Sequence, residues 1–262
     1  FVLWRVMKKA LNWLFPLFSV GILVFIYYIA SIKADSKIVA PQLDLIVKNL
    51  GAVMRRADFA ESVFSTLWRA VYGFIISLLI ALIFCIGANA SKIVERLLSP
   101  LIVFSRAIPT MSIILVCLIW LREKTPVAVS VVIVFPMLYS ALREAIRLSD
   151  AEMKDVIKVY RVPTSKAIIK YYVPDVFIRA FPQLVTTLSF NVKLTVSGEA
   201  LSHTSVSIGN AMSVANLNFD TATLFAWTIV AVLLAFVVEL VLKGIYMGVK
   251  KIRYEYCSRK SY

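Results

Sequence analysis

Six apolar stretches of roughly 20 residues follow one another along the 262-residue chain, and they are the dominant feature of its pattern. A helix rises 1.5 Å per residue, so about 20 apolar residues cross the roughly 30 Å of hydrocarbon in a bilayer. We therefore predict an all-α fold with six transmembrane helices in a single membrane domain, residues 1–262. The predicted spans lie near residues 12–31, 61–88, 98–121, 126–146, 181–201 and 222–246.

A polar and basic segment, residues 143–179, separates the fourth apolar stretch from the fifth. Apolar residues recur every three or four positions over 153–160 and again over 167–172, which is the spacing of one helix face. Pro163 interrupts the pattern. We predict two short amphipathic helices joined by a turn, with Pro174 ending the second. Such a segment suits either docking into a groove of a soluble partner or packing against its own bundle.

The charges are distributed unevenly between the two sides that six spans define. The chain has a net charge of +14, and eight of its basic residues lie within 143–179. Other basic residues cluster at both termini and between the second and third spans, whereas 202–221 contains no Lys or Arg. By the positive-inside rule, both termini and the segment 147–180 are predicted to be cytoplasmic. This distribution fits a lipid bilayer and gives no support to a nucleic-acid partner.

A shorter amphipathic pattern lies between the first and second spans. Leu43, Ile46, Leu50 and Val53 recur at helical spacing, with charged residues elsewhere around the helix. We predict a short helix here, either lying on the outer membrane interface or packed on the spans.

Several ionisable or helix-breaking residues fall inside the apolar stretches. Pro109 should kink or break the third span, because proline lacks a backbone donor and clashes with the preceding turn. Lys193 is expected near the bilayer midplane, where an ionisable group usually has a function. Glu199 lies about 120° around the same helix, so the two would pair across a dimer axis or each face a water-filled path. We predict a translocation path that includes Arg106, Pro109, Asn191, Lys193 and Glu199.

Arg69 lies well inside the second span, where a guanidinium is costly in hydrocarbon. Two arrangements would relieve this cost. The side chain either snorkels to the outer headgroups or forms a structural pair inside the bundle.

The chain shows no catalytic or metal-binding pattern. Nucleophile motifs, phosphate-binding loops and an HExxH motif are lacking. Cys85, Cys117 and Cys257 suggest no disulfide or metal site, and His203 has no second ligand at a suitable spacing. We therefore predict no catalytic residue, no metal and no cofactor in this chain, and we do not expect it to be an enzyme.

A series of short motifs over residues 60–200 resembles the permease subunits of binding-protein-dependent ABC importers. In that family the second span reads S-L-x-R-x-x-x-G-F, the third contains D-P and R-A-I-P and closes with W-F-G, and the fourth and fifth contain F-P and W-K…A-E. The branch that transports nitrate, sulfonates, taurine and aminopyrimidines is the most similar. The matching residues are Thr66-Leu-Trp-Arg69 with Gly73-Phe74, Leu98-Ser-Pro100 with Arg106-Ala-Ile-Pro109, Ile119-Trp120, Phe135-Pro136, and Lys193 with Glu199.

The 143–179 segment resembles the cytoplasmic loop of these permeases, which reads E-A-A, three residues, G, nine residues, I-x-L-P. Alignment on Val173-Pro174 places Asp155-Val-Ile157 on E-A-A and Arg161 on the glycine. Arginine does not adopt φ > 0 freely as glycine does, so the turn is expected to differ from that of the family. The resemblance assigns contact with an ATPase to Asp155, Val156, Ile157, Tyr160, Arg161, Val162, Pro163 and Thr164.

The resemblance implies the type I ABC importer permease fold, with a five-helix core and cytoplasmic coupling helices in the coupling segment 147–180. It implies a location in the inner (plasma) membrane of a bacterial cell. It also implies a homodimer with a second permease copy, two cytoplasmic ATPase subunits that bind ATP and Mg, and an extracellular or periplasmic substrate-binding protein. The implied function is ATP-driven import of a small solute such as a sulfonate, a nitrate-like anion or an aminopyrimidine. The rival interpretations are an ion-coupled secondary transporter and a non-transporting membrane scaffold, and copurification with an ATPase separates them.

Overall fold

The computed structural model of the chain describes residues 2–33, 40–149, 157, 159–160 and 163–259. Within these residues all regular secondary structure is helical, which confirms the predicted all-α class. A 3₁₀ turn covers Arg122–Lys124 and a π-helical turn covers Ile168–Tyr172. The α-helices are α1 (Val2–Lys33), α2 (Leu43–Met54), α3 (Phe59–Ala90), α4 (Lys92–Ala107), α5 (Thr110–Leu121), α6 (Thr125–Arg147), α8 (Thr164–Ala167), α9 (Val173–Ser202), α10 (Ile208–Leu217) and α11 (Thr221–Arg259).

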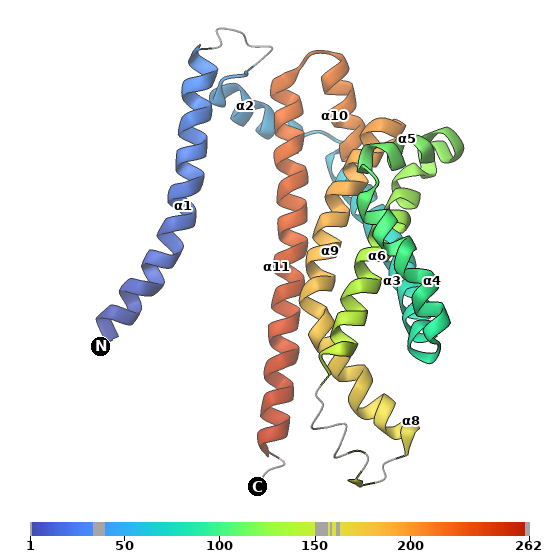
Figure 1. Cartoon of the computed structure of the whole chain (residues 1–262). Coiled ribbons are helices and arrows are strands. Elements are labelled where there is room, and N and C mark those ends of the chain that lie inside the picture. Colours follow the sequence, from blue (N-terminus) through green and yellow to red (C-terminus); the bar gives the residue numbers. More distant parts are fainter. Residues whose placement is uncertain (1, 34–39, 150–156, 158, 161–162, 260–262) are drawn as a thin grey trace.

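The long helices run between two ends of the molecule, the upper and lower ends in Figure 1. Helices α2, α5 and α10 lie at the upper end, and α8 lies at the lower end. Helix α1 begins and α11 ends at the lower end, so these two chain ends lie on the same side as α8. The predicted topology requires this arrangement. Which side of the membrane each end faces stays a prediction.

Three helical stretches are long and apolar enough to cross a membrane, counted where the structure describes the residues. They are Phe59–Ala90, Thr110–Arg147 and Thr221–Gly248, and Gly21–Lys33 forms a shorter apolar helix. Helix α9 has 30 residues, but polar side chains such as Lys193 lower its hydropathy. The count of six transmembrane helices therefore stays a prediction.

The third predicted span, 98–121, is not one helix. Helix α4 ends at Ala107, Ile108 and Pro109 have extended backbone with ψ of 128° and 130°, and α5 begins at Thr110. The break occurs at the proline, as its chemistry predicts. With 12 residues, α5 is only about 18 Å long and cannot cross the hydrocarbon alone. Arg122, with φ of 46°, then turns the chain into α6.

The prediction that Pro174 ends a helix is wrong. The chain is helical from Thr164 through α8, the π-helical turn and α9 to Ser202. Pro174 lies inside this continuous helix, and the π-helical turn just before it changes the hydrogen-bond register, so the proline is accommodated without ending the helix. Figure 1 shows the lower part of this continuous helix bent away from the axis of α9.

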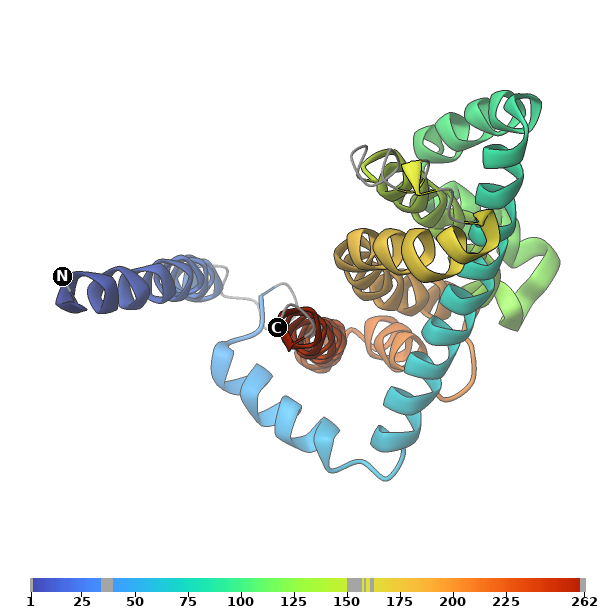
Figure 2. The ribbon, with the colours of Figure 1, turned by 90° about the horizontal axis from the view of Figure 1, so that it is seen from below.

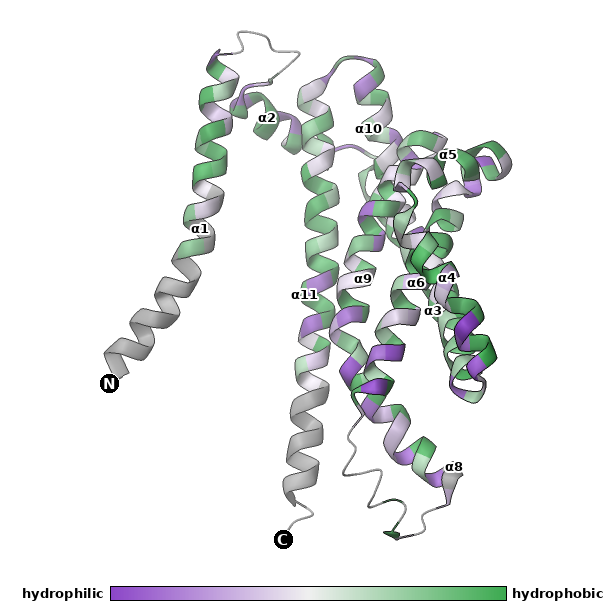
Figure 3. Cartoon of the chain, viewed as in Figure 1, coloured by the Kyte–Doolittle hydropathy of each residue, from purple (hydrophilic) through white to green (hydrophobic). Residues whose placement is uncertain are grey.

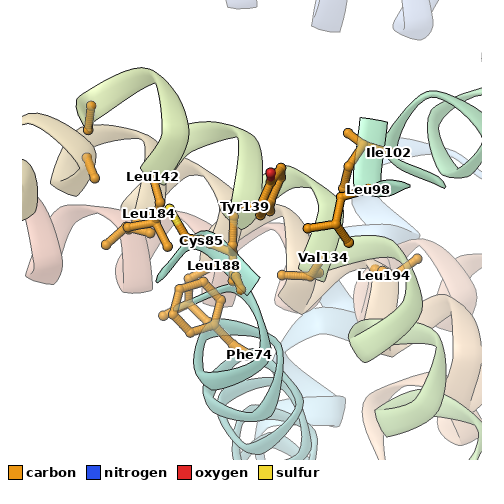
Figure 4. Close-up of a cluster of buried hydrophobic side chains, with 14 of the residues drawn as sticks. Phe74, Cys85, Leu98, Ile102, Val134, Tyr139, Leu142, Leu184, Leu188 and Leu194 are labelled. Atoms are coloured by element: carbon orange, nitrogen blue, oxygen red, sulfur yellow. The ribbon is translucent and has the colours of Figure 1, made fainter. Parts of the chain in front are cut away.

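Helices α3, α6 and α9 form the main core. A Cβ on Gly73 of α3 would lie 2.6 Å from Cβ of Ser130 on α6, so only glycine permits this close approach. Ser77 donates a hydrogen bond to the Ser130 carbonyl at 3.3 Å across the same contact. Figure 4 shows apolar side chains from α3, α4, α6 and α9, including Phe74 and Leu188, that form the surrounding cluster.

A second cluster at the upper end joins α2, α10 and α11. Trp227 is fully buried and packs in one cluster with Val53 of α2 and Ile208 of α10. Seen from below in Figure 2, α2 lies across the direction of α11 rather than along it. The predicted helix between the first two spans is thus present, and it packs on the bundle.

The topology is testable by cysteine labelling. Lys48 on α2 and Lys170 near α8 are both exposed and lie at opposite ends of the molecule. In intact cells, a membrane-impermeant maleimide is expected to label Lys48→Cys and to leave Lys170→Cys unlabelled until the membrane is permeabilised. The opposite pattern would invert the topology.

Candidate translocation path and coupling site

A buried ion pair joins α3 to α9 near the upper end. Arg69 Nη1 donates to Glu199 Oε1 at 2.9 Å, and the Glu199 side chain is completely buried. Thr66, one turn before Arg69, donates its hydroxyl to Glu199 Oε2 at 2.8 Å. The two alternatives for Arg69 are thereby distinguished, because its guanidinium forms a structural pair inside the bundle.

The N-terminus of α10 forms hydrogen bonds with two of these side chains, Thr66 and Glu199. Gly209 N donates to Glu199 Oε2 at 3.3 Å, and Ile208 N donates to Thr66 Oγ1 at 3.1 Å. Ser207 caps the helix by accepting from Asn210 N at 3.1 Å. The first donors of a helix have no partner within the helix, and a carboxylate placed there also complements the helix dipole. Glu199 is therefore the point where α3, α9 and α10 are joined.

Two of the residues predicted for the translocation path are buried inside the helix bundle. Glu199 has the partners just described, and Asn191 is fully buried, with its amide donating to the Ala70 carbonyl of α3 at 2.7 Å. Because Glu199 already binds Arg69, it does not need Lys193 to balance its charge. In this structure both residues connect helices rather than line an open surface.

Lys193 is exposed on the face of α9 that the rest of the described chain leaves uncovered. Gln183, Thr186, Phe190, Lys193 and Ser197 are exposed at intervals of three and four residues, so they form one stripe along the helix. We call these five residues the α9 stripe. It combines polar, aromatic and cationic groups, which suits a surface that contacts a polar solute.

A cavity of about 630 Å³ lies beside the lower half of this stripe. It lies between the α4–α5 break, α6 and α9, and Ser105, Thr110, Glu144 and Gln183 supply polar groups to its wall. The helix break at Pro109 therefore lies beside a cavity whose wall is mostly apolar with a few polar groups. Irregular backbone is tolerated at membrane depth where it is buried in protein or lines a water-filled cavity. Pro109 is exposed at this break, and Arg106 belongs to the last turn of α4. Their role in the path stays a prediction.

Two charged residues of α11 were not among the predicted path residues. Glu239 and Lys243 form an ion pair with 2.5 Å between Oε1 and Nζ, on the side of α11 next to α9. The sequence contains a signal for this pair. Glu239 is a carboxylate inside the sixth apolar stretch, and its charge is as costly in hydrocarbon as that of Lys193.

A second cavity, of about 680 Å³ and with both polar and apolar groups in its wall, lies at the lower end between α3, α4 and α6. Arg143 of α6 crosses it, donating to Asn89 of α3 at 3.0 Å and pairing with Glu95 of α4. This contact ties the α3–α4 turn to the end of α6, directly before the coupling segment begins.

The described part of the coupling segment exposes apolar side chains. Val159 and Tyr160 are each 77% exposed and lie between the end of α6 and the start of α8. Ile157 is partly buried and Pro163 is exposed, whereas Thr164 begins α8. Asp155, Val156, Arg161 and Val162 lie outside the described residues.

The sequence matches a family of known proteins. Residues 73–251 match the model of the binding-protein-dependent transport system inner membrane component. The chain belongs to this family. It is thus an ABC importer permease with membrane helices, a subunit that is not itself catalytic. No curated protein sequence matches the chain significantly.

Solved structures of ABC transporters have the same fold. One is the crystal structure of an amino acid ABC transporter with histidines, with a TM-score of 0.62 at 14% identity over 77% of this chain and 97% of the other. An inward-facing MetNI methionine ABC transporter gives 0.60 at 13% identity, over 72% and 93%. A second crystal form of MetNI gives 0.57 at 15% identity, over 72% and 95%. These likenesses bear out the type I importer permease fold.

Proposed function

We propose that this permease forms a homodimer that moves a small solute across the bacterial inner membrane, driven by two cytoplasmic ATPase subunits. An extracellular or periplasmic binding protein delivers the solute. ATP and Mg bind the ATPase, and the permease converts the movement of its partner into alternating access. Energy enters because the partner binds the two permease conformations with different affinity.

The exposed apolar side chains of the coupling segment carry this proposal. Val159 and Tyr160 are exposed, and they precede α8, the helix at the lower end in Figure 1. A short helix that presents apolar side chains flanked by charge is the usual ligand of a hydrophobic groove. The family match supplies the partner, because a binding-protein-dependent permease works with an ATPase.

Tyr160→Asp tests the coupling site. Placing a carboxylate in an apolar groove without a counter-charge costs several kcal/mol, so binding of the ATPase should weaken by at least a hundredfold. The measurement is copurification of the ATPase with tagged permease from detergent-solubilised membranes. Tyr160→Phe, which keeps the ring, should copurify the ATPase normally.

Insertion of the variant must be checked in the same membranes. Tyr160 is exposed, so the Tyr160→Asp permease should still insert and elute as a folded dimer. Undiminished ATPase copurification with Tyr160→Asp and Val159→Asp would place the docking site elsewhere.

The substrate class rests on the motifs of the chain. The second, third and fifth spans resemble the branch that carries nitrate, sulfonates, taurine and aminopyrimidines, and Lys193 on the α9 stripe suits an anion. The structures with similar folds come from amino acid and methionine transporters. At a sequence identity of 13–14%, these structures support the same fold for this chain and do not indicate the same substrate.

A further inference from the structure

Three charged side chains lie together on the adjoining faces of α9 and α11. Glu239 pairs with Lys243 on α11, and Lys193 of α9 is close enough to Glu239 to interact with its charge. The Ser189 hydroxyl also lies near Glu239, although it makes no hydrogen bond of normal length. We call Lys193, Glu239 and Lys243 the charged strip. Figure 3 shows the matching hydrophilic bands on α9 and on the otherwise hydrophobic α11.

The antiparallel packing of the two helices fixes the height of the strip. Phe181 stacks on Tyr246 with 5.1 Å between ring centroids, and the Tyr246 hydroxyl donates to the Ile178 carbonyl at 3.4 Å. Counting from the upper end of α9 at 1.5 Å per residue, Lys193 lies about 14 Å down. Phe181, which is level with Tyr246, lies about 32 Å down, so counting back along α11 places Lys243 about 27 Å and Glu239 about 21 Å down. With a hydrocarbon layer that begins at the top of α9, Lys193 and Glu239 lie inside its thickness of roughly 30 Å and Lys243 lies near its lower edge.

The face that carries the strip is unfavourable against lipid. An ionised side chain at membrane depth is costly unless water or a counter-charge meets it. Glu239 and Lys243 supply each other's counter-charge, whereas no ion-pair partner of Lys193 lies within the described chain. Lys193 is exposed, and the side chains of Glu239 and Lys243 are 31% and 56% exposed, so the rest of the described chain does not cover them. Water inside the assembled permease would meet all three side chains.

The strip also has an excess of positive charge. Its one carboxylate is bonded to Lys243, and the other nearby carboxylate, Glu199, is bonded to Arg69. Lys193 is left with no dedicated counter-charge among these groups. An ammonium held in this way at the wall of a narrow path attracts anions and raises their local concentration.

We infer that the charged strip of α9 and α11 is a water-facing wall of the translocation path and that it binds an anionic group of the transported solute. Glu239 is a positioning residue, which holds Lys243 and offsets part of the charge beside Lys193. Lys193 and Lys243 supply the ammonium groups that meet the anion. The inference rests on the proposed importer function and adds α11 to the path.

Charge-selective cysteine labelling of the assembled importer in membrane vesicles tests this inference without the substrate. In a background with Cys85, Cys117 and Cys257 replaced by Ala, Ser197→Cys places a thiol one turn above Lys193. An anionic methanethiosulfonate should react there faster than a cationic one of similar size. Adding Lys193→Gln should lower the ratio of the two rates about tenfold, and adding Glu239→Gln should raise it.

The same helix provides the control for accessibility. Val241 is 55% exposed and lies about 200° around α11 from Glu239 at nearly the same height. Glu239→Cys should react with both charged reagents, and Val241→Cys with neither, because it faces lipid. Reaction at Val241→Cys but not at Glu239→Cys would overturn the water-facing assignment. A rate ratio at Ser197→Cys that Lys193→Gln leaves unchanged would overturn the anion site.

The design separates this inference from the proposed function. ATPase copurification is measured in the same vesicles, so loss of the ATPase with the labelling pattern intact would reject the importer assembly alone. Labelling of Lys48→Cys at the upper end shows that each variant has inserted. A properly inserted, ATPase-bound permease with an unreactive strip would reject the strip alone.

Discussion

Replacing Arg69 with alanine is expected to destabilise the folded permease by about 3–5 kcal/mol. The reason is the environment of Glu199, which is completely buried and has Arg69 as its only ion-pair partner among the described residues. Removing the guanidinium leaves the carboxylate in the bundle with only the Thr66 hydroxyl and the Gly209 N–H as donors. The measurement is the free energy of unfolding in mixed detergent micelles.

Two comparisons make this expectation specific. Arg56→Ala removes an ion pair with Asp58 in which both side chains are about half exposed, so it should cost less than about 1 kcal/mol. The double change Arg69→Met with Glu199→Leu removes both charges and should recover much of the loss. A cost for Arg69→Ala no greater than that for Arg56→Ala would mean that the pair does not hold the helices together.

A methyl group at Gly209 is expected to have the next largest effect. An ideal Cβ there would lie 2.4 Å from the Val196 carbonyl oxygen and 2.6 Å from the Ala200 backbone nitrogen. Backbone atoms cannot turn aside as a flexible side chain can. Gly209→Ala should therefore displace α10 from α9 and cost about 1–3 kcal/mol or more, measured by the same unfolding assay.

The chain offers a matched glycine for comparison. Gly51 also lies in a short helix at the upper end, but a Cβ added there would meet nothing within 4 Å. Gly51→Ala should be neutral or stabilising by up to about 1 kcal/mol, because alanine favours a helix. If the two alanine variants unfold alike, the close contact between α9 and α10 is not maintained in the membrane.

These two predictions are coupled through one carboxylate. Displacing α10 breaks the bond from Gly209 N to Glu199, and removing Arg69 weakens the hold on the same side chain. The costs of Arg69→Ala and Gly209→Ala should therefore combine non-additively in the double variant, as contacts in one network do.

The sequence predicted the helices well wherever local chemistry decides them. The second and fourth predicted spans, 61–88 and 126–146, agree with α3 and α6 to within two residues at each end. Pro109 breaks the third span as its missing donor requires. The prediction fails at Pro174 because a π-helical turn accommodates this proline inside a continuous helix, and sequence alone does not reveal such a turn.

The functional residues were predictable singly but not as partners. Arg69 and Glu199 are each recognisable as charges inside apolar stretches, yet 130 residues separate them and only the packing of α3 on α9 brings them together. Lys193 and Glu199, although close in sequence, point to different surroundings because 120° of helix lies between them. Glu239 is not among the predicted residues because the apolar residues around it dominate the average over that span.

The continuous helix from Thr164 to Ser202 gives the permease a lever. At 1.5 Å per residue, its 39 residues would be about 58 Å long if straight, so a tilt of about 10° imposed at the lower end would move the far end by roughly 10 Å. The π-helical turn and Pro174 interrupt the regular hydrogen bonding of this lever, so bending concentrates between 168 and 174. That compliant section lies below the α9 stripe. Under the coupling proposed above, a movement of the ATPase would reach Lys193 through the regular upper part of α9, and the stiffness of residues 168–174 would set how much of that movement is transmitted.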